Sequence, residues 1–219
     1  MTKNIKYVSL IKDSLDNQTS KLPNWILEMD GMSGVKYRHF INNLINSLED
    51  PRYLEIGCWK GSTLCSAIFG NKVKSYCIDN WSQFDGPKDI FYKNIQKCTD
   101  ECADIKIIFK EADFRKINYT EIEKYNIYFF DGPHEEQDQY DALMFVQPAL
   151  DDEFIFICDD WNWEKVKNGT MNAIKKLNLE VLFSIDIKTT DDCSHPPENN
   201  ARQNSDWHNG YYISVLKKM

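Results

Sequence analysis

Ile127-Tyr-Phe-Phe130, followed directly by Asp131-Gly-Pro-His134, carries the strongest fold signal in this chain. An uninterrupted apolar run of this kind is typical of a strand buried on both faces, as in a parallel sheet. A second apolar run, Phe154-Ile-Phe-Ile-Cys158, is followed in the same way by Asp159-Asp160. In an open α/β sheet, ligands bind just beyond the carboxyl ends of the parallel strands. We therefore expect three carboxylates and one imidazole to converge in one crevice.

Such a group of side chains favours a bound cation. Carboxylates that lie close together cannot all stay ionised without one, and oxygen ligands suit a hard divalent ion such as Mg²⁺ or Mn²⁺. Asp131, Asp159 and Asp160 are the predicted metal ligands. The alternative is that Asp159 and Asp160 cap the following helix and that Asp131 belongs to an ordinary turn.

From residue 52 onward the chain alternates between strand and helix patterns, which predicts a doubly wound, mostly parallel sheet of seven strands. The last two strands have no helix between them, so we expect an antiparallel strand at the sheet edge. The expected strands are 53–56, 75–78, 105–109, the two apolar runs above, 180–187 and 211–216. The expected helices are 62–69, 91–102, a short one opened by a capping box at 120–123, 135–145 and 166–177.

The chain divides into residues 1–50, an N-terminal helical cap, and residues 51–219, the α/β domain. The clearest helix of the cap is 33–48, with Ser33 as its N-cap. A long polar loop at 189–209 separates the last two strands, and a loop of that length is usually a lid or disordered.

The first predicted strand leads into a turn that suits a nucleotide-like cofactor. Glu55 is followed by Gly57, which allows a close backbone approach, and Gly61 permits a tight entry into the helix that starts at Ser62. We assign all four residues to cofactor binding. The alternative for Glu55 is a surface carboxylate near a helix N-terminus.

Acidic residues follow the next strands. Asp79 ends the second strand, where an acid can bind ribose hydroxyls, and Asp113 follows the third, where it can meet the adenine edge. Asp131 is assigned both to the cofactor and to the metal. Asp79 could instead be a turn residue.

The composition limits the classes of ligand. The net charge of the 219 residues is −8, which argues against nucleic acid or an anionic membrane as a partner. The N-terminus has no apolar core of a signal peptide, and no stretch is long enough to cross a bilayer. Seven cysteines, several of them inside apolar runs, indicate reduced thiols. We expect a cytoplasmic protein that acts on a small molecule, with a homo-oligomer left open.

The acid-x-Gly motif at Glu55, together with Asp79 and Asp113, resembles the class I S-adenosylmethionine-dependent methyltransferases. Within that superfamily, Asp131-Gly-Pro-His134 with Asp159-Asp160 is similar to the metal-dependent sugar O-methyltransferases of the macrocin type, over roughly residues 29–216. The resemblance implies that the three aspartates hold magnesium and that His134 is the catalytic base. The chain departs from the most familiar glycine-rich motif at Cys58-Trp59.

The chemistry of these residues is consistent with that implication. A sugar hydroxyl is a poor nucleophile, and coordination to a divalent ion lowers its pKa. An imidazole, with an unperturbed pKa of about 6.5, can accept the proton near neutral pH. His134 could instead be a fourth metal ligand, which would favour manganese, iron or zinc.

The sequence thus predicts a metal-dependent O-methyltransferase that uses S-adenosylmethionine and methylates a hydroxyl of a small molecule, with a sugar or sugar-bearing acceptor as the best guess. Two alternatives remain open at this point. The acidic cluster would also serve a metal-dependent glycosyltransferase or hydrolase. The chain could also be a non-catalytic binding module with a methyltransferase-like fold.

Overall fold

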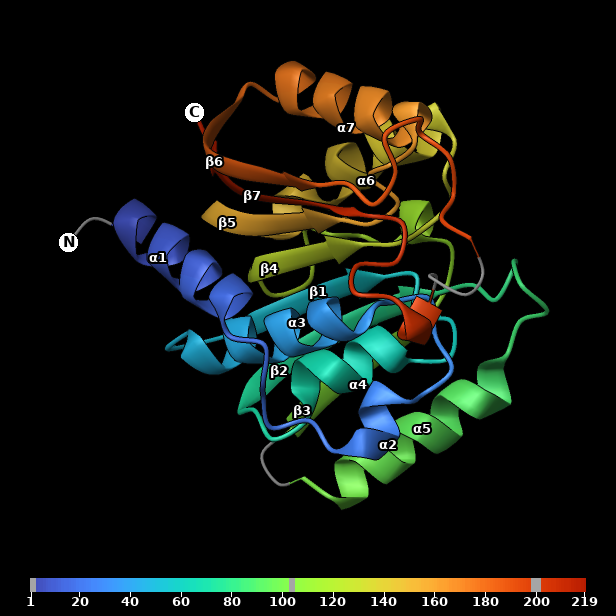
Figure 1. The fold of residues 1–219 in the computed structure, drawn as a ribbon. Coiled ribbons are helices and arrows are strands. Elements are labelled where there is room, and N and C mark those ends of the chain that lie inside the picture. The colour runs from blue at the N-terminus through green and yellow to red at the C-terminus, as the bar shows by residue number, and fades with distance from the viewer. Residues whose placement is uncertain (1–2, 103–104, 198–201) are drawn as a thin grey trace.

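The computed structural model describes residues 3–102, 105–197 and 202–219. Within them, seven strands form one sheet in the order β3-β2-β1-β4-β5-β7-β6 (Figure 1). The strands are β1 (Arg52–Ile56), β2 (Val73–Asp79), β3 (Ile105–Glu111), β4 (Tyr125–Phe130), β5 (Leu150–Cys158), β6 (Leu179–Ile187) and β7 (Tyr211–Lys218).

Strands β1 to β5 are mutually parallel, and the order reverses between β1 and β4. This reversal is the topological switch point at which open α/β sheets bind ligands. Strand β7 lies between β5 and β6 and pairs antiparallel with both, so the edge strand β6 is antiparallel to its neighbour. The predicted fold class, a doubly wound and mostly parallel sheet with an antiparallel edge pairing, is confirmed.

Helices cover both faces of the sheet, and each face has its own apolar core. One core includes apolar side chains from the N-terminal helices and from α4 and α5, and the other includes side chains from α6 and α7. The helices are α1 (Lys3–Asp16), α2 (Asn24–Leu27), α3 (Val35–Ser47), α4 (Ser62–Ile68), α5 (Lys88–Asp100), α6 (Glu136–Val146) and α7 (Glu164–Lys176). Short 3₁₀ helices occur at η1 (Phe114–Lys116), η2 (Gln147–Ala149) and η4 (Arg202–Asn204).

The start of α3 differs from the prediction. Its N-cap is Gly34, without a side-chain cap, so the assignment of Ser33 as N-cap is wrong. The first backbone N–H groups of α3 instead donate to the carbonyls of Ser205 and Asp206, at 2.8 Å from Val35. Because this distant loop satisfies the helix N-terminus, no local cap is needed. Ser33 accepts a hydrogen bond from Arg38 instead.

The short helix predicted from the capping box at 120–123 is absent from this described stretch, which consists of turns. Asn118 explains the difference, because its side-chain oxygen accepts from both the backbone N–H and the hydroxyl of Thr120. That contact closes an Asx turn, so the Thr120 hydroxyl does not cap a helix. Glu123 forms an ion pair with Lys74 on β2.

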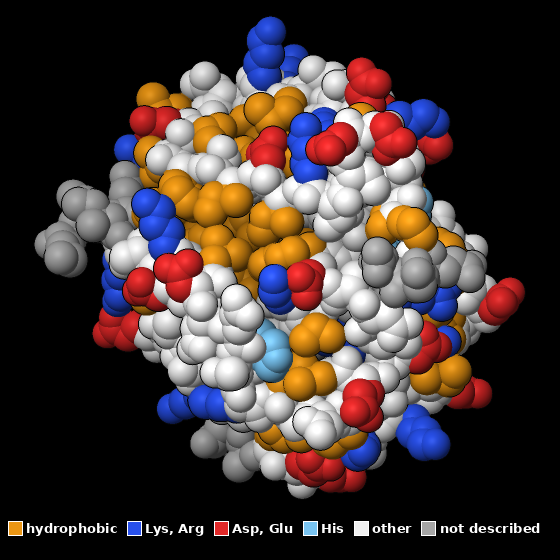
Figure 2. Space-filling view, in the orientation of Figure 1, with side chains coloured by type: hydrophobic (Ala, Val, Ile, Leu, Met, Phe, Trp, Pro, Cys, Tyr) orange, Lys and Arg blue, Asp and Glu red, His pale blue; other side chains and the backbone are white. Residues whose placement is uncertain are grey.

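The surface visible in Figure 2 mixes acidic and basic side chains, without one continuous basic face in that view. No helix of the described residues is both long and apolar enough to cross a membrane. All seven cysteines are free thiols.

Candidate active site

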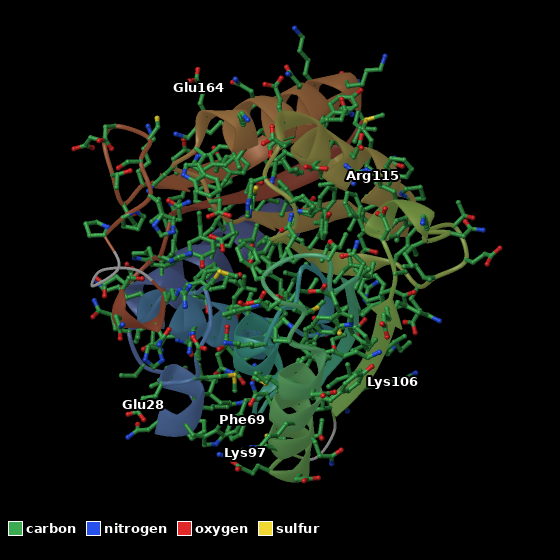
Figure 3. The ribbon with its side chains drawn as sticks, turned by 90° about the vertical axis from the view of Figure 1, so that its right-hand side faces the viewer. Glu28, Phe69, Lys97, Lys106, Arg115 and Glu164 are labelled. Carbon is green, nitrogen blue, oxygen red and sulfur yellow. The ribbon has the colours of Figure 1, made fainter. Side chains whose placement is uncertain are left out.

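A cavity of about 810 Å³ opens at the carboxyl ends of β1, β2, β4 and β5, where the order of the sheet reverses. The predicted site residues that line it are Gly57, Asp79, Asp113, Asp131, His134, Asp159 and Asp160. Figure 3 looks onto this end of the sheet. The volume lies in the range of small-molecule and cofactor sites.

Gly57 brings the turn after β1 against the end of β4. Its φ is +87°, and a Cβ at this position would lie 1.8 Å from the backbone oxygen of Asp131. Only glycine therefore fits here. Gly61 precedes α4 with φ +81°, where a Cβ would meet Phe91 at 3.1 Å. The two glycines allow the turn that the sequence predicted.

The carboxylate of Asp79 accepts hydrogen bonds from the backbone of this turn. One oxygen accepts the backbone N–H groups of Cys58 and Trp59 at 2.8 and 2.9 Å, and the other accepts that of Trp81 at 2.8 Å. These bonds fix both loops that border the cavity. A carboxylate has about four lone-pair sites and three are used here, so one site remains on the oxygen that binds Trp81.

Asp113, in the loop after β3, lines the same cavity. It caps η1 by accepting the backbone N–H of Arg115 at 3.0 Å. Arg115, labelled in Figure 3, forms ion pairs with Asp138 at 2.5 Å and Asp141 at 2.7 Å on α6. The loop after β3 is thereby tied to the helix after β4.

Three predicted cofactor residues do not line the cavity, namely Glu55, Gly61 and Ser62. Glu55 is fully buried and accepts a hydrogen bond from the Tyr53 hydroxyl at 2.6 Å. Burial, with a smaller contribution from the charge of Asp79, raises the pKa of Glu55 to about 8. Ser62 is buried beside Ser33, with 3.4 Å between their hydroxyl oxygens. The side chains of Glu55 and Ser62 therefore lie in the protein interior, outside the cavity.

The ends of β4 and β5 bring together the acidic group expected from the sequence. His134 Nε2 lies 2.6 Å from one carboxylate oxygen of Asp160, and the Asp159 carboxylate accepts the backbone N–H of Asp160 at 2.8 Å. The backbone N–H of Asp131 donates to Ile56, which joins the end of β4 to β1. Three carboxylates and one imidazole therefore share one wall of the cavity.

The pKa values of the three carboxylates in this wall shift in different directions. Burial, together with the charges of Asp159 and Asp160, raises the pKa of Asp131 well above its ordinary value. Burial and the charge of Asp160 likewise raise the pKa of Asp159. Burial is the largest single influence on Asp160 and opposes its ionisation, but the hydrogen bonds from His134 and Asn209 and the charge of His134 together outweigh burial and lower the pKa of Asp160. Burial also opposes the charged form of His134, but the hydrogen bond with Asp160 and the neighbouring acidic charges together raise the pKa of His134.

One oxygen or nitrogen atom from each of Asp131, His134 and Asp160 lies within 4.8 Å of the others, a spacing that could hold a metal ion. Asp159, which the sequence assigned as a ligand, is not in this group, whereas His134, which the sequence gave as a ligand only in the alternative interpretation, is in it. A cation placed among these donors would offset the acidic charge that now raises the pKa of Asp131. The donor set fits a divalent ion.

Several cavity residues lie outside the set of site residues predicted from the sequence. Trp163 stacks edge-on against His134 with ring centroids 5.0 Å apart, and His195 and His208 lie 5.2 Å apart on the same side. Burial lowers the pKa of His208 to about 4, so this ring is neutral near pH 7. These residues come from the 189–209 loop and from the segment before α7, where no local pattern marks a site.

Comparison with solved structures shows that the fold is that of the S-adenosylmethionine-dependent methyltransferases. An O-methyltransferase from Bacillus cereus in complex with SAH matches with a TM-score of 0.56 and 11% identity, covering 99% of this chain and 91% of its own. A putative RNA methyltransferase from Pyrococcus horikoshii matches with a TM-score of 0.54 and 13% identity, covering 100% of this chain and 99% of its own.

TrmN from Thermus thermophilus matches with a TM-score of 0.53 and 12% identity over 84% of this chain. The match covers 48% of TrmN, so the chain spans about half of its length. No protein-family model and no curated protein matches the sequence. At these identities the structural likeness establishes the fold, and the activity has to be argued from the site.

Proposed function

We propose that this protein is a divalent-metal-dependent O-methyltransferase that uses S-adenosylmethionine and methylates a hydroxyl of a small molecule, with a sugar as the favoured acceptor. The observation that carries the proposal is the Asp131, His134 and Asp160 group in the same cavity as the turn at Gly57. A cofactor pocket and a metal-competent acid–imidazole group thus border one space of about 810 Å³.

The cofactor end of the cavity is the turn after β1 with the ends of β2 and β3. Gly57 keeps the backbone open to a ligand, Asp79 has one remaining lone-pair site for a ribose hydroxyl, and Asp113 belongs to the loop after β3. The solved neighbour from Bacillus cereus contains SAH, which supports the same class of cofactor here. Glu55 and Ser62 would then have no contact with the ligand.

The metal end would be held by Asp131, Asp160 and either Asp159 or His134 as the third protein ligand, with the remaining positions open to substrate oxygens. Bound S-adenosylmethionine supplies an electrophilic methyl group, and a bound divalent ion lowers the pKa of a coordinated hydroxyl. His134 lies beside the Asp160 carboxylate, which orients its ring. Where Asp159 is the third metal ligand, His134 stays free to accept the proton of the acceptor hydroxyl. Trp163 excludes water from one edge of the imidazole.

An RNA substrate is less favoured, although one neighbour is a putative RNA methyltransferase. The net charge is −8, and Figure 2 shows no continuous basic face on that side of the molecule. RNA binding depends on neutralising phosphates with Lys and Arg. The same charge is compatible with a neutral polyhydroxyl acceptor. Seven free thiols also suit the reducing cytoplasm, which we propose as the location.

The test is a methyl-transfer assay with radiolabelled S-adenosylmethionine, purified chelator-treated protein and a panel of sugars, glycosides and catechols. We expect transfer to at least one hydroxyl acceptor that depends on added Mg²⁺ or Mn²⁺ and disappears in Asp160→Ala. Metal-independent transfer would refute the metal role. Transfer to RNA alone would refute the acceptor class.

A further inference from the structure

Asp160 presents its two carboxylate oxygens to two different partners. One oxygen faces His134 at 2.6 Å. The other accepts a hydrogen bond from the side-chain amide of Asn209, also at 2.6 Å. Asn209 is fully buried just before β7, separated from Asp160 by 49 positions in the chain. The hydrogen bond from Asn209 therefore fixes the rotation of the Asp160 carboxylate, through the oxygen that does not face His134.

The backbone at Asp160 also needs support from its surroundings. Its φ is +57°, a left-handed conformation that is strained for a non-glycine residue. The next two residues are held by the segment that contains Asn209. Trp161 donates its N–H to the carbonyl of Gly210 at 3.2 Å, and Asn162 donates to that of Asn209 at 3.0 Å. Hydrogen bonds with the segment before β7 thus fix the Asp160 side chain and the backbone of the two residues that follow it.

The orientation of the Asn209 amide follows from a chain of hydrogen bonds with a fixed direction. The backbone N–H of Thr189 can only donate, and its acceptor is the side-chain oxygen of Asn162 at 3.0 Å. The Asn162 amide nitrogen must then donate to the Asn209 oxygen, also at 3.0 Å. Asn209 is left with its nitrogen toward Asp160. A flipped Asn209 amide would place two nitrogens against each other at Asn162 and two oxygens against each other at Asp160.

We propose that Asn209 is a positioning residue of the metal centre, which binds one oxygen of Asp160 and leaves the other directed at the metal-competent group. This inference rests on the proposed function, because it assumes that the group binds a divalent cation. It also links the 189–209 loop to that centre, since Thr189 and Asn209 lie at the two ends of the loop.

The test uses Mn²⁺ as the probe, titrated calorimetrically into the chelator-stripped full chain. In Asn209→Ala we expect the Mn²⁺ dissociation constant to rise about 10-fold or more, the usual effect of losing a partner that orients a metal ligand. The matched control is Asn126→Ala, which removes a buried amide at the opposite end of the sheet, where it bonds Arg52 and Asp50. This control should lower the melting temperature while Mn²⁺ affinity stays within about 2-fold of wild type.

If Asn209→Ala does not fold, Asn209→Leu retains the side-chain volume and removes the same hydrogen bonds, and the same rise is expected. A double-mutant cycle gives the sharper criterion. In an Asp160→Ala background, removing Asn209 should leave the residual Mn²⁺ affinity unchanged, because Asn209 acts through Asp160. An equal loss in both backgrounds would overturn the positioning role.

Two further outcomes are distinguishable. A wild-type protein that binds Mn²⁺, with an Asn209→Ala variant that binds it equally well, overturns this inference alone. A folded wild-type protein that binds no Mn²⁺ contradicts the metal dependence in the proposed function, and the positioning role with it.

Discussion

At the scale of single residues, the cavity wall contains more carboxylates than its present hydrogen bonds can stabilise. Asp160 is paired with His134 and Asn209, and its pKa is lowered. Asp131 and Asp159 have raised pKa values because they are buried near that charge. This imbalance is the physical argument for a cation, and it can be tested one residue at a time.

Asp160→Ala and Asp79→Ala should separate the two halves of the site. Removing Asp160 should weaken Mn²⁺ binding at least ~10-fold and leave the dissociation constant for SAH nearly unchanged, because the metal donors lose an ionised ligand. Removing Asp79 should do the opposite, since three backbone N–H groups that shape the cofactor turn lose their acceptor. Calorimetric titration of both ligands against both variants measures this. The reverse pattern would contradict the assignment of the two ends.

Glu55→Gln should change how stability depends on pH. The pKa of Glu55 is about 8 in the fold and 4.5 ordinarily, so between these values the native state binds a proton that the unfolded state has released. The free energy of unfolding therefore falls as pH rises through this window, by about 1.4 kcal/mol for each pKa unit. Glutamine is neutral at every pH and removes this slope.

Melting curves of metal-free wild type and Glu55→Gln between pH 4.5 and 8 check this expectation. The variant should match wild type at the acidic end and become progressively more stable than wild type toward the alkaline end. The contributions of Asp131 and Asp159 are present in both proteins and cancel in the difference. Parallel pH profiles would show that Glu55 is ionised within the fold.

At the scale of elements, the turn between β1 and α4 depends on backbone contact with the end of β4. Gly57→Ala places a Cβ 1.8 Å from the Asp131 carbonyl oxygen, and backbone atoms on both sides would have to move. We expect a loss of about 3 kcal/mol or more in the free energy of unfolding. Chemical denaturation of the variant and wild type measures it.

Gly70→Ala is the matched control for this substitution. Gly70 also has a positive φ, of +67°, but its Cβ would meet only the flexible Lys21 side chain at 3.1 Å. The cost should be close to ~1 kcal/mol, the conformational term alone. Equal losses at the two glycines would mean that the close approach at Gly57 is not what stabilises the turn.

The elements predicted from the sequence are those with a strong local signal. Strands β4 and β5 were predicted from the apolar runs before Asp131 and Asp159. The turn after β1 was predicted from the glycines at 57 and 61. The prediction failed at Ser33 and at the capping box of Thr120, where distant or side-chain partners replaced the local bond. The contact of Asn209 with Asp160 could not be predicted from the sequence, because it depends on the pairing of β5 with β7.

At the scale of the whole molecule, segments far apart in the chain meet around the cavity mouth. Arg38 is buried and donates to the carbonyls of Ile26 and Met29 at 2.7 and 2.8 Å, which fixes the segment before α3. The start of α3 in turn binds the carbonyls of Ser205 and Asp206. The segment before α3, through Met32, and the 189–209 loop therefore line the same cavity.

The most direct test of the central claim is a calorimetric titration of the chelator-stripped protein, first with SAH and then with Mg²⁺ in its presence. We expect saturable binding of both SAH and Mg²⁺, each at about one equivalent per chain. Saturable Mg²⁺ binding without any binding of SAH would contradict this expectation, and would direct attention to a metal-dependent glycosyltransferase or hydrolase.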